Sequence, residues 1–74
     1  MRPYRNLGGN SGVVEWEEGP DSISVRFRSG DVYVYSYESA GRRHVEEMKR
    51  LAHVGRGLSA YISQHLGVKN GYVK

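Results

Sequence analysis

Apolar and polar residues alternate along the first half of the chain, and the spacing becomes helical in the second half. Ile23, Val25 and Phe27 alternate with serine and arginine, a period of two that is typical of a half-buried strand. Strand-forming residues also fill 11–17 and 32–37, and Gly-Pro-Asp and Ser-Gly turn signals separate the three runs. The first half therefore predicts three antiparallel strands.

The turn between the second and third strands decides which sheet face carries the tyrosines. A two-residue loop would place them on the outer face. A three-residue loop that ends with Gly30 in the left-handed conformation would place Tyr33 opposite Val25, on the core side. Tyr35 would then lie opposite Ile23. Serine before glycine is a poor start for a type I′ turn, so we favour the three-residue loop.

After residue 38 the apolar positions recur every three or four residues. The spacing of Val45 and Met48 predicts a helix over 42–54, for which Ser39 is a candidate cap. A glycine-rich break follows, and a second apolar stripe predicts a short helix over 58–66. The pattern predicts an α+β fold, in which a three-stranded antiparallel sheet is followed by two short helices packed on one face.

The chain has 74 residues, enough for one domain. We assign 1–9 to a flexible lead-in, 10–67 to the domain and 68–74 to a flexible tail. There is no cysteine, which excludes disulfides and thiolate metal sites. Because no segment resembles a signal peptide or a membrane span, we expect a cytoplasmic protein with no membrane partner.

Positive charge gathers in the second half of the chain, where seven Lys or Arg face three Glu. A basic helical face is typical of phosphate binding, so it is a candidate nucleic-acid site. Glu46 and Glu47 in the same segment also suit an ordinary solvated helix face, and both interpretations remain open. The candidate nucleic-acid-binding residues are Arg42, Arg43, Lys49, Arg50 and Arg56.

Aromatic residues on the predicted third strand have two interpretations. Tyr33 and Tyr35, near Arg26 and Arg28, would form a stacking platform for unpaired bases if they faced outward. In the favoured register they pack under the helices with their hydroxyls at the rim. We also expect Trp16 to lie in the core.

Familiar catalytic and metal-binding patterns do not occur in the sequence. His44, His53 and His65 lack zinc-like spacing, and His65 falls on the apolar stripe of the last helix, where we expect it to be half-buried. There is no Gly-x-Ser-x-Gly element and no phosphate-cradling glycine loop. We therefore expect a protein that is not an enzyme and has no metal or small-molecule cofactor.

Several spaced elements together resemble the KTSC domain, a short module named after the C-terminus of some lysyl-tRNA synthetases and also found alone in bacterial and phage proteins. The elements are Asn10-Ser11, Ile23-x-Val25-x-Phe27, Gly30, Tyr33-Val34-Tyr35, Ala52-His53-Val54-Gly55-Arg56 and Ile62. The resemblance covers about residues 10–66. Trp16 and Val54 depart from the family pattern, and no Val-Pro precedes the helix. The association with a tRNA synthetase implies RNA binding.

Two function classes follow from these observations. The first is a small binding module for RNA or another single-stranded nucleic acid, which would use the basic helical face. The second is a protein-interaction module, either a homodimer or the partner of a host protein. It would use an open sheet edge or the outer sheet face, where the favoured register places Val32 and Val34 beside Ser24 and Arg26.

Overall fold

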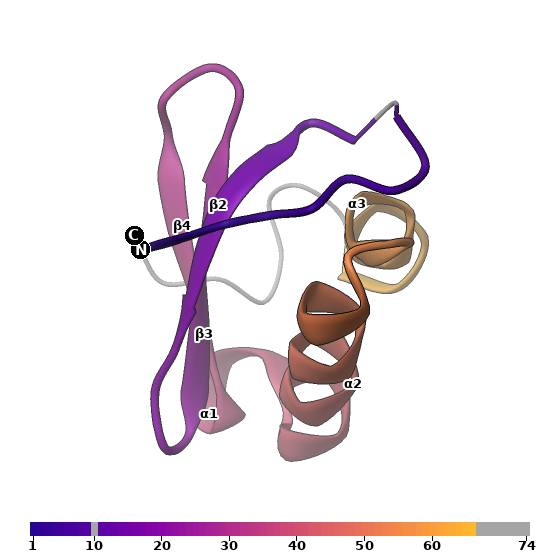
Figure 1. Ribbon diagram of the computed structural model, residues 1–74. Helices are drawn as coiled ribbons and strands as arrows, with labels where there is room; N and C mark the ends of the chain where they lie inside the picture. Colours follow the sequence, from indigo (N-terminus) through magenta and orange to yellow (C-terminus); the bar gives the residue numbers. More distant parts are fainter. Residues whose placement is uncertain (10, 67–74) are drawn as a thin grey trace.

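The computed structural model describes residues 1–9 and 11–66. Four strands form one antiparallel sheet in the order β1-β2-β3-β4, and α2 and α3 lie on one of its faces (Figure 1). The α+β fold is therefore confirmed. The elements are β1 (Arg2–Pro3), β2 (Val13–Glu18), β3 (Ser22–Phe27), β4 (Val32–Ser36), α1 (Tyr37–Ala40), α2 (Arg42–Val54), α3 (Leu58–Tyr61) and the π-helix η1 (Ile62–Leu66).

The register between β3 and β4 is the one favoured from the turn chemistry. Val25 lies opposite Tyr33 and Ile23 lies opposite Tyr35. Three residues form the loop, because the Phe27 amide donates to the Asp31 carbonyl at 2.9 Å. The last of them is a glycine with a φ of 97°, a conformation that costs glycine little. The turn residues thus determined which side chains face the core.

The expectation of three strands is wrong, because the N-terminal segment adds a fourth. Arg2 pairs with Trp16 at the edge of the sheet, and the Tyr4 amide donates to the Val14 carbonyl at 2.9 Å. Tyr4 is only 7% exposed, so the segment expected to be a flexible lead-in contributes to the core. A two-residue strand is too short to show a period in sequence. The predicted tail at 68–74 lies outside the described residues.

The core lies between the sheet and the helices. Trp16 and Tyr35 are the largest sheet side chains in it, 3% and 0% exposed. From α2 come Val45, Met48 and Ala52, which match the apolar spacing seen in the sequence. The other buried apolar side chains are Tyr4, Val13, Ile23, Val25, Leu58 and Ile62.

Between β4 and α2 the chain forms α1, which the sequence pattern did not predict. Ser36 caps α1, because its hydroxyl accepts from the Ser39 amide at 3.0 Å while the Ser39 hydroxyl accepts from the Ser36 amide. The assignment of Ser39 as the cap of the long helix is therefore wrong. That helix begins after Gly41 and ends at Val54, the predicted bounds. A four-residue helix without a buried side chain leaves no apolar stripe to detect.

The second predicted helix spans the expected residues but changes its hydrogen bonding midway. It is α-helical over Leu58–Tyr61 and π-helical over Ile62–Leu66. The i→i+5 bonding of a π-helix widens the turn and alters the angular spacing of the side chains. Within residues 1–9 and 11–66, no helix has the length and apolar character needed to cross a bilayer.

Candidate functional site

The five predicted basic residues do not form one surface. Their alignment required a helix that continues past Gly55, but Gly55 has a φ of 85° and its amide donates to the Leu51 carbonyl, which ends α2. Arg56 therefore lies beyond the helix and faces a different part of the molecule. The remaining four residues lie on α2 but divide between its two exposed sides.

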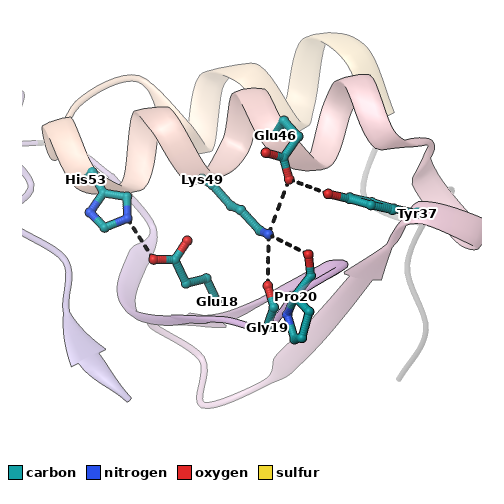
Figure 2. A network of polar contacts seen from close by, with 7 residues as sticks. All are labelled: Glu18, Gly19, Pro20, Tyr37, Glu46, Lys49 and His53. Carbon is teal, nitrogen blue, oxygen red and sulfur yellow. Dashed lines mark hydrogen bonds and ion pairs between the residues drawn. The ribbon is translucent and has the colours of Figure 1, made fainter.

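Lys49 is part of the contact between α2 and the sheet. Its ammonium group donates to the carbonyls of Gly19 at 2.8 Å and Pro20 at 3.3 Å, in the turn between β2 and β3 (Figure 2). It also forms an ion pair with Glu46 at 3.2 Å. Its side chain is 12% exposed, so this cation is already coordinated and is a poor candidate for ligand binding.

Figure 2 shows further polar contacts on the same side of α2, which we call the clamp: Tyr37, Glu46, Lys49, the Gly19 and Pro20 carbonyls, Glu18 and His53. The Tyr37 hydroxyl donates to Glu46 at 2.7 Å. That hydrogen bond, followed by the one from Lys49, lowers the pKa of Glu46 below its ordinary value. The same bond raises the pKa of Tyr37. The clamp joins α1, α2 and the end of β2.

Arg42 and His53 lie at opposite ends of the clamp. The Arg42 guanidinium is 5.8 Å from the centre of the Tyr37 ring, a cation–π distance. His53 is hydrogen-bonded to Glu18 at 2.8 Å, and its ring meets Trp16 edge-on at 4.7 Å. Like Lys49, these residues connect α2 to neighbouring elements.

The other exposed side of α2 borders an open groove of about 640 Å³. Arg43 and Arg50 line it from α2, and Tyr61 and His65 line it from α3 and η1. The structure thus brings two of the five predicted cations together with two aromatic rings. We call this surface the α2–η1 groove; its other lining residues are Glu47 and Glu46, the second of which it shares with the clamp.

The rings of His44, Tyr61 and His65 form a ladder, of which Tyr61 and His65 line the groove. The Tyr61 and His65 rings have centroids 4.4 Å apart and an interplanar angle of 32°. His44 Nδ1 lies 2.7 Å from the Tyr61 hydroxyl, and this hydrogen bond holds the Tyr61 ring in place beside His65. His65 is exposed, which corrects the expectation that it is half-buried on the apolar stripe. The π-helical turn alters the 3.6-residue spacing on which that expectation rested.

The two arginines of the groove differ in their electrostatic surroundings. Arg50 Nε donates to Glu47 at 2.9 Å, and this pairing lowers the pKa of Glu47 and raises that of Arg50. Arg43 forms no ion pair within the described residues. The pKa of the Tyr61 hydroxyl is raised, first by burial and then by the Glu47 charge, so the phenol stays neutral and keeps its proton. Of the two arginines, Arg43 is the more available cation, because Glu47 pairs with Arg50.

The tyrosines of β4 pack on the core side, as the favoured register predicts. Tyr35 is 0% exposed, so its ring is inaccessible to a stacking base and its hydroxyl is not at the rim as expected. Tyr33 is half-buried against Phe27, with ring centroids 5.3 Å apart. Tyr35 is enclosed because the helices cover the middle of β4.

The sequence pattern did not predict the ring ladder, because it placed two of the three rings on the apolar stripe of a helix. Tyr61 and His65 are four residues apart on that helix, and this spacing was the signal that could have paired them. His44 comes from a different helix, so no sequence signal joined it to them. No protein-family model, curated protein or solved structure matches the chain. The resemblance to the KTSC domain therefore stays a prediction.

Proposed function

We propose that the chain is a small non-enzymatic binding module that binds single-stranded nucleic acid, RNA in the first place, at the α2–η1 groove. The observation that carries the proposal is the exposed His65 ring, stacked on Tyr61 in the groove that Arg43 also lines. Aromatic rings and cations side by side are the usual components of single-strand binding surfaces.

Each component of the groove has a defined task in this proposal. An unpaired base stacks on the solvent face of His65 and extends the ladder, because every base has a π-face. Arg43 contacts the phosphate backbone, which gives affinity without sequence preference. Arg50 contributes less, because Glu47 already neutralises its charge.

Binding of a short labelled single-stranded RNA at low salt and two higher salt concentrations tests the proposal. We expect the logarithm of the binding constant to fall with the logarithm of salt, by a slope of about 0.7 per phosphate contact. His65→Ala should weaken binding by about fivefold or more, the effect of losing one stacked base. Arg43→Gln should weaken it and reduce the slope by about one contact.

Arg42→Gln is the matched control, because it removes the same charge from the clamp side of α2, and Arg42 does not line the groove. We expect it to retain most of the affinity. If Arg42→Gln and Arg43→Gln weaken binding equally, net charge alone attracts the RNA and the groove is not the site. The absence of binding at low salt would overturn the proposal altogether.

A second candidate function is protein binding at the outer face of the sheet. Val34 lies opposite Ser24 and Val32 lies opposite Arg26 on this face, and the described α2 and α3 both cover the other one (Figure 1). Half-buried valines beside a serine and an arginine suit contact with a second copy or another protein. A monomeric mass in solution, together with salt-dependent RNA binding, would favour the groove over this face.

A further inference from the structure

A second cavity, of about 280 Å³, lies between the N-terminal loop and the break that follows α2. Tyr4, Asn6 and Ser11 line it from the loop, and Arg56 and Ser59 line it from the opposite side. These residues are distinct from those that line the groove. The cavity combines segments that are more than forty residues apart in the sequence.

Hydrogen bonds hold both walls of this cavity in place. The Leu7 amide donates to the Gly55 carbonyl at 2.7 Å, and the Leu58 amide donates to the Tyr4 hydroxyl at 3.3 Å. Within the loop, the Ser11 amide donates to Asn6 Oδ1 at 3.0 Å. The cavity is therefore built into the fold rather than left between loosely placed segments.

One arginine lines this cavity, and two others contact residues in or beside its walls. Arg56 lines it, and Arg28 donates to the carbonyl of Ser11, a lining residue, at 3.3 Å. The stem of Arg5 lies over Gly55, so closely that a Cβ at position 55 would be 2.6 Å from the Arg5 Cβ. Among the described residues, no Asp or Glu lines the cavity. The described lining thus carries the positive charge of Arg56 and no negative charge.

Elsewhere in the described part of the chain, the arginines other than Arg43 have a charged or aromatic partner. Arg26 and Arg50 form ion pairs with glutamates, and Arg2 lies over the Trp16 ring. Arg5 and Arg56 have neither kind of partner among the described residues. Arg56 therefore keeps a charge at the cavity that no described carboxylate neutralises, and this charge favours an anion.

The polar groups that line the cavity also favour a ligand that accepts hydrogen bonds and donates none. Asn6 uses its Oδ1 to accept from the Ser11 amide, which leaves its amide N–H groups to donate. The Ser11 hydroxyl accepts from the Val13 amide at 3.0 Å, so its own proton is available to a ligand. The half-buried Ser59 supplies a second hydroxyl. With the Arg56 guanidinium, these groups can donate several hydrogen bonds to one anion.

We propose that this cavity binds a phosphate group, held by Arg56 with donors from Asn6, Ser11 and Ser59. Phosphate accepts several charge-assisted hydrogen bonds at once, and a guanidinium matches its geometry. The volume is near the lower limit of small-ligand pockets, about 300 Å³, so the phosphate carries at most a small organic part into the cavity. The site is independent of the α2–η1 groove.

Titration of the isotope-labelled chain with inorganic phosphate, followed by NMR at constant ionic strength in chloride, tests this site. We expect saturable shifts at the amides of Asn6, Ser11, Arg56 and Ser59 and little change along α2. Arg56→Gln should weaken phosphate binding about tenfold or more, the effect of losing a charge-assisted hydrogen bond. Arg56 is exposed, so this variant should keep a native spectrum.

Arg42→Gln again serves as the control, because it changes the net charge equally and lies outside the cavity. Equal weakening by both variants, or shifts that rise linearly without saturation, would overturn the proposal. The probe is inorganic phosphate and Arg56 lies outside the groove. A failure of phosphate binding therefore does not overturn nucleic-acid binding at the groove, and a failure of nucleic-acid binding does not overturn the phosphate site.

The source of the phosphate is distinguished by comparing a 5′-phosphorylated oligonucleotide with its 5′-hydroxyl form. Tighter binding of the phosphorylated form, lost in Arg56→Gln, would assign the cavity to a strand terminus. Equal binding of the two forms, with inorganic phosphate still saturating the cavity, would assign it to a small phosphate ester.

Discussion

The two exposed sides of α2 carry similar charge patterns but have different environments. On the clamp side, Glu46, Lys49 and His53 contact the sheet or α1 (Figure 2). On the groove side, Arg43 and Arg50 have similar spacing, yet their only described ion pair stays within the helix, between Arg50 and Glu47. The first set joins elements of the fold, whereas the second is presented to solvent.

This difference shows that the role of a basic residue on a helix depends on the groups that lie opposite it. Lys49 and Arg43 are equally plausible phosphate ligands in the sequence. The turn between β2 and β3 presents two carbonyls to Lys49, and the groove presents stacked rings beside Arg43. The two carbonyls accept hydrogen bonds from the Lys49 ammonium group. The Arg43 guanidinium lies at a groove that is open to solvent, where a ligand can reach it.

The largest expected effect comes from the apolar stripe that lies between the two sides. Met48 is 0% exposed, so Met48→Ala should lower the free energy of unfolding by about 2–5 kcal/mol. Met48→Leu, which nearly conserves volume, should lose less than about 1.5 kcal/mol. Urea unfolding measures both. A loss in Met48→Ala below about 1 kcal/mol would mean that the polar clamp, rather than packing, holds α2 on the sheet.

A smaller effect should separate the two cations directly. Lys49→Met keeps the aliphatic stem but removes two hydrogen bonds to carbonyls, and should lower the free energy of unfolding by about 1 kcal/mol. Arg43→Met should change it by less than about 0.5 kcal/mol, as is usual for an exposed position. If urea unfolding shows that the two variants lose the same free energy of unfolding, the clamp and the groove do not differ in their contribution to stability.

The smallest expected effect is a difference in pH dependence between the two sides. The folded pKa of Glu46 is lowered from 4.5, chiefly by the Tyr37 hydrogen bond. Its contribution to stability is present above pH 4.5 and is lost as the pH falls through the folded pKa. In Glu46→Gln, the urea concentration at the unfolding midpoint should therefore fall less steeply as the pH is lowered.

Glu47→Gln is the comparison variant, because the pKa of Glu47 is also lowered but by a partner on the same helix. We expect it to flatten the acid decline less than Glu46→Gln, since the Glu47 pair links no separate elements. A larger effect of Glu47→Gln would show that contacts within α2 outweigh those of the clamp.

Local patterns in the sequence predicted much of the fold. The alternation around Val25 predicted β3, and the glycine at position 30 favoured the observed register with β4, because backbone twist and side-chain period are local properties. The bounds of α2 followed from its apolar spacing and the glycine at position 55. By contrast, β1 and α1 are too short to show a period, so only their contacts reveal them.

The candidate sites depended much less on local pattern. The sequence identified Arg43 and Arg50 as basic helical residues, but it could not separate them from Lys49, whose partners are about thirty positions away. It assigned Tyr61 and His65 to an apolar stripe, since a π-helical turn has no distinct sequence period.

The sequence by itself determined the α+β class and the break between the helices, and it favoured the register between β3 and β4. Each of these depends on residues close together in the chain, where turn chemistry and periodicity act. Only the tertiary structure decided which charges are satisfied within the protein and which face solvent, and it alone brought Arg56 to one cavity with Asn6 and Ser11. Electrostatic environment depends on distance in space, and strands and helices bring together residues that the chain keeps apart.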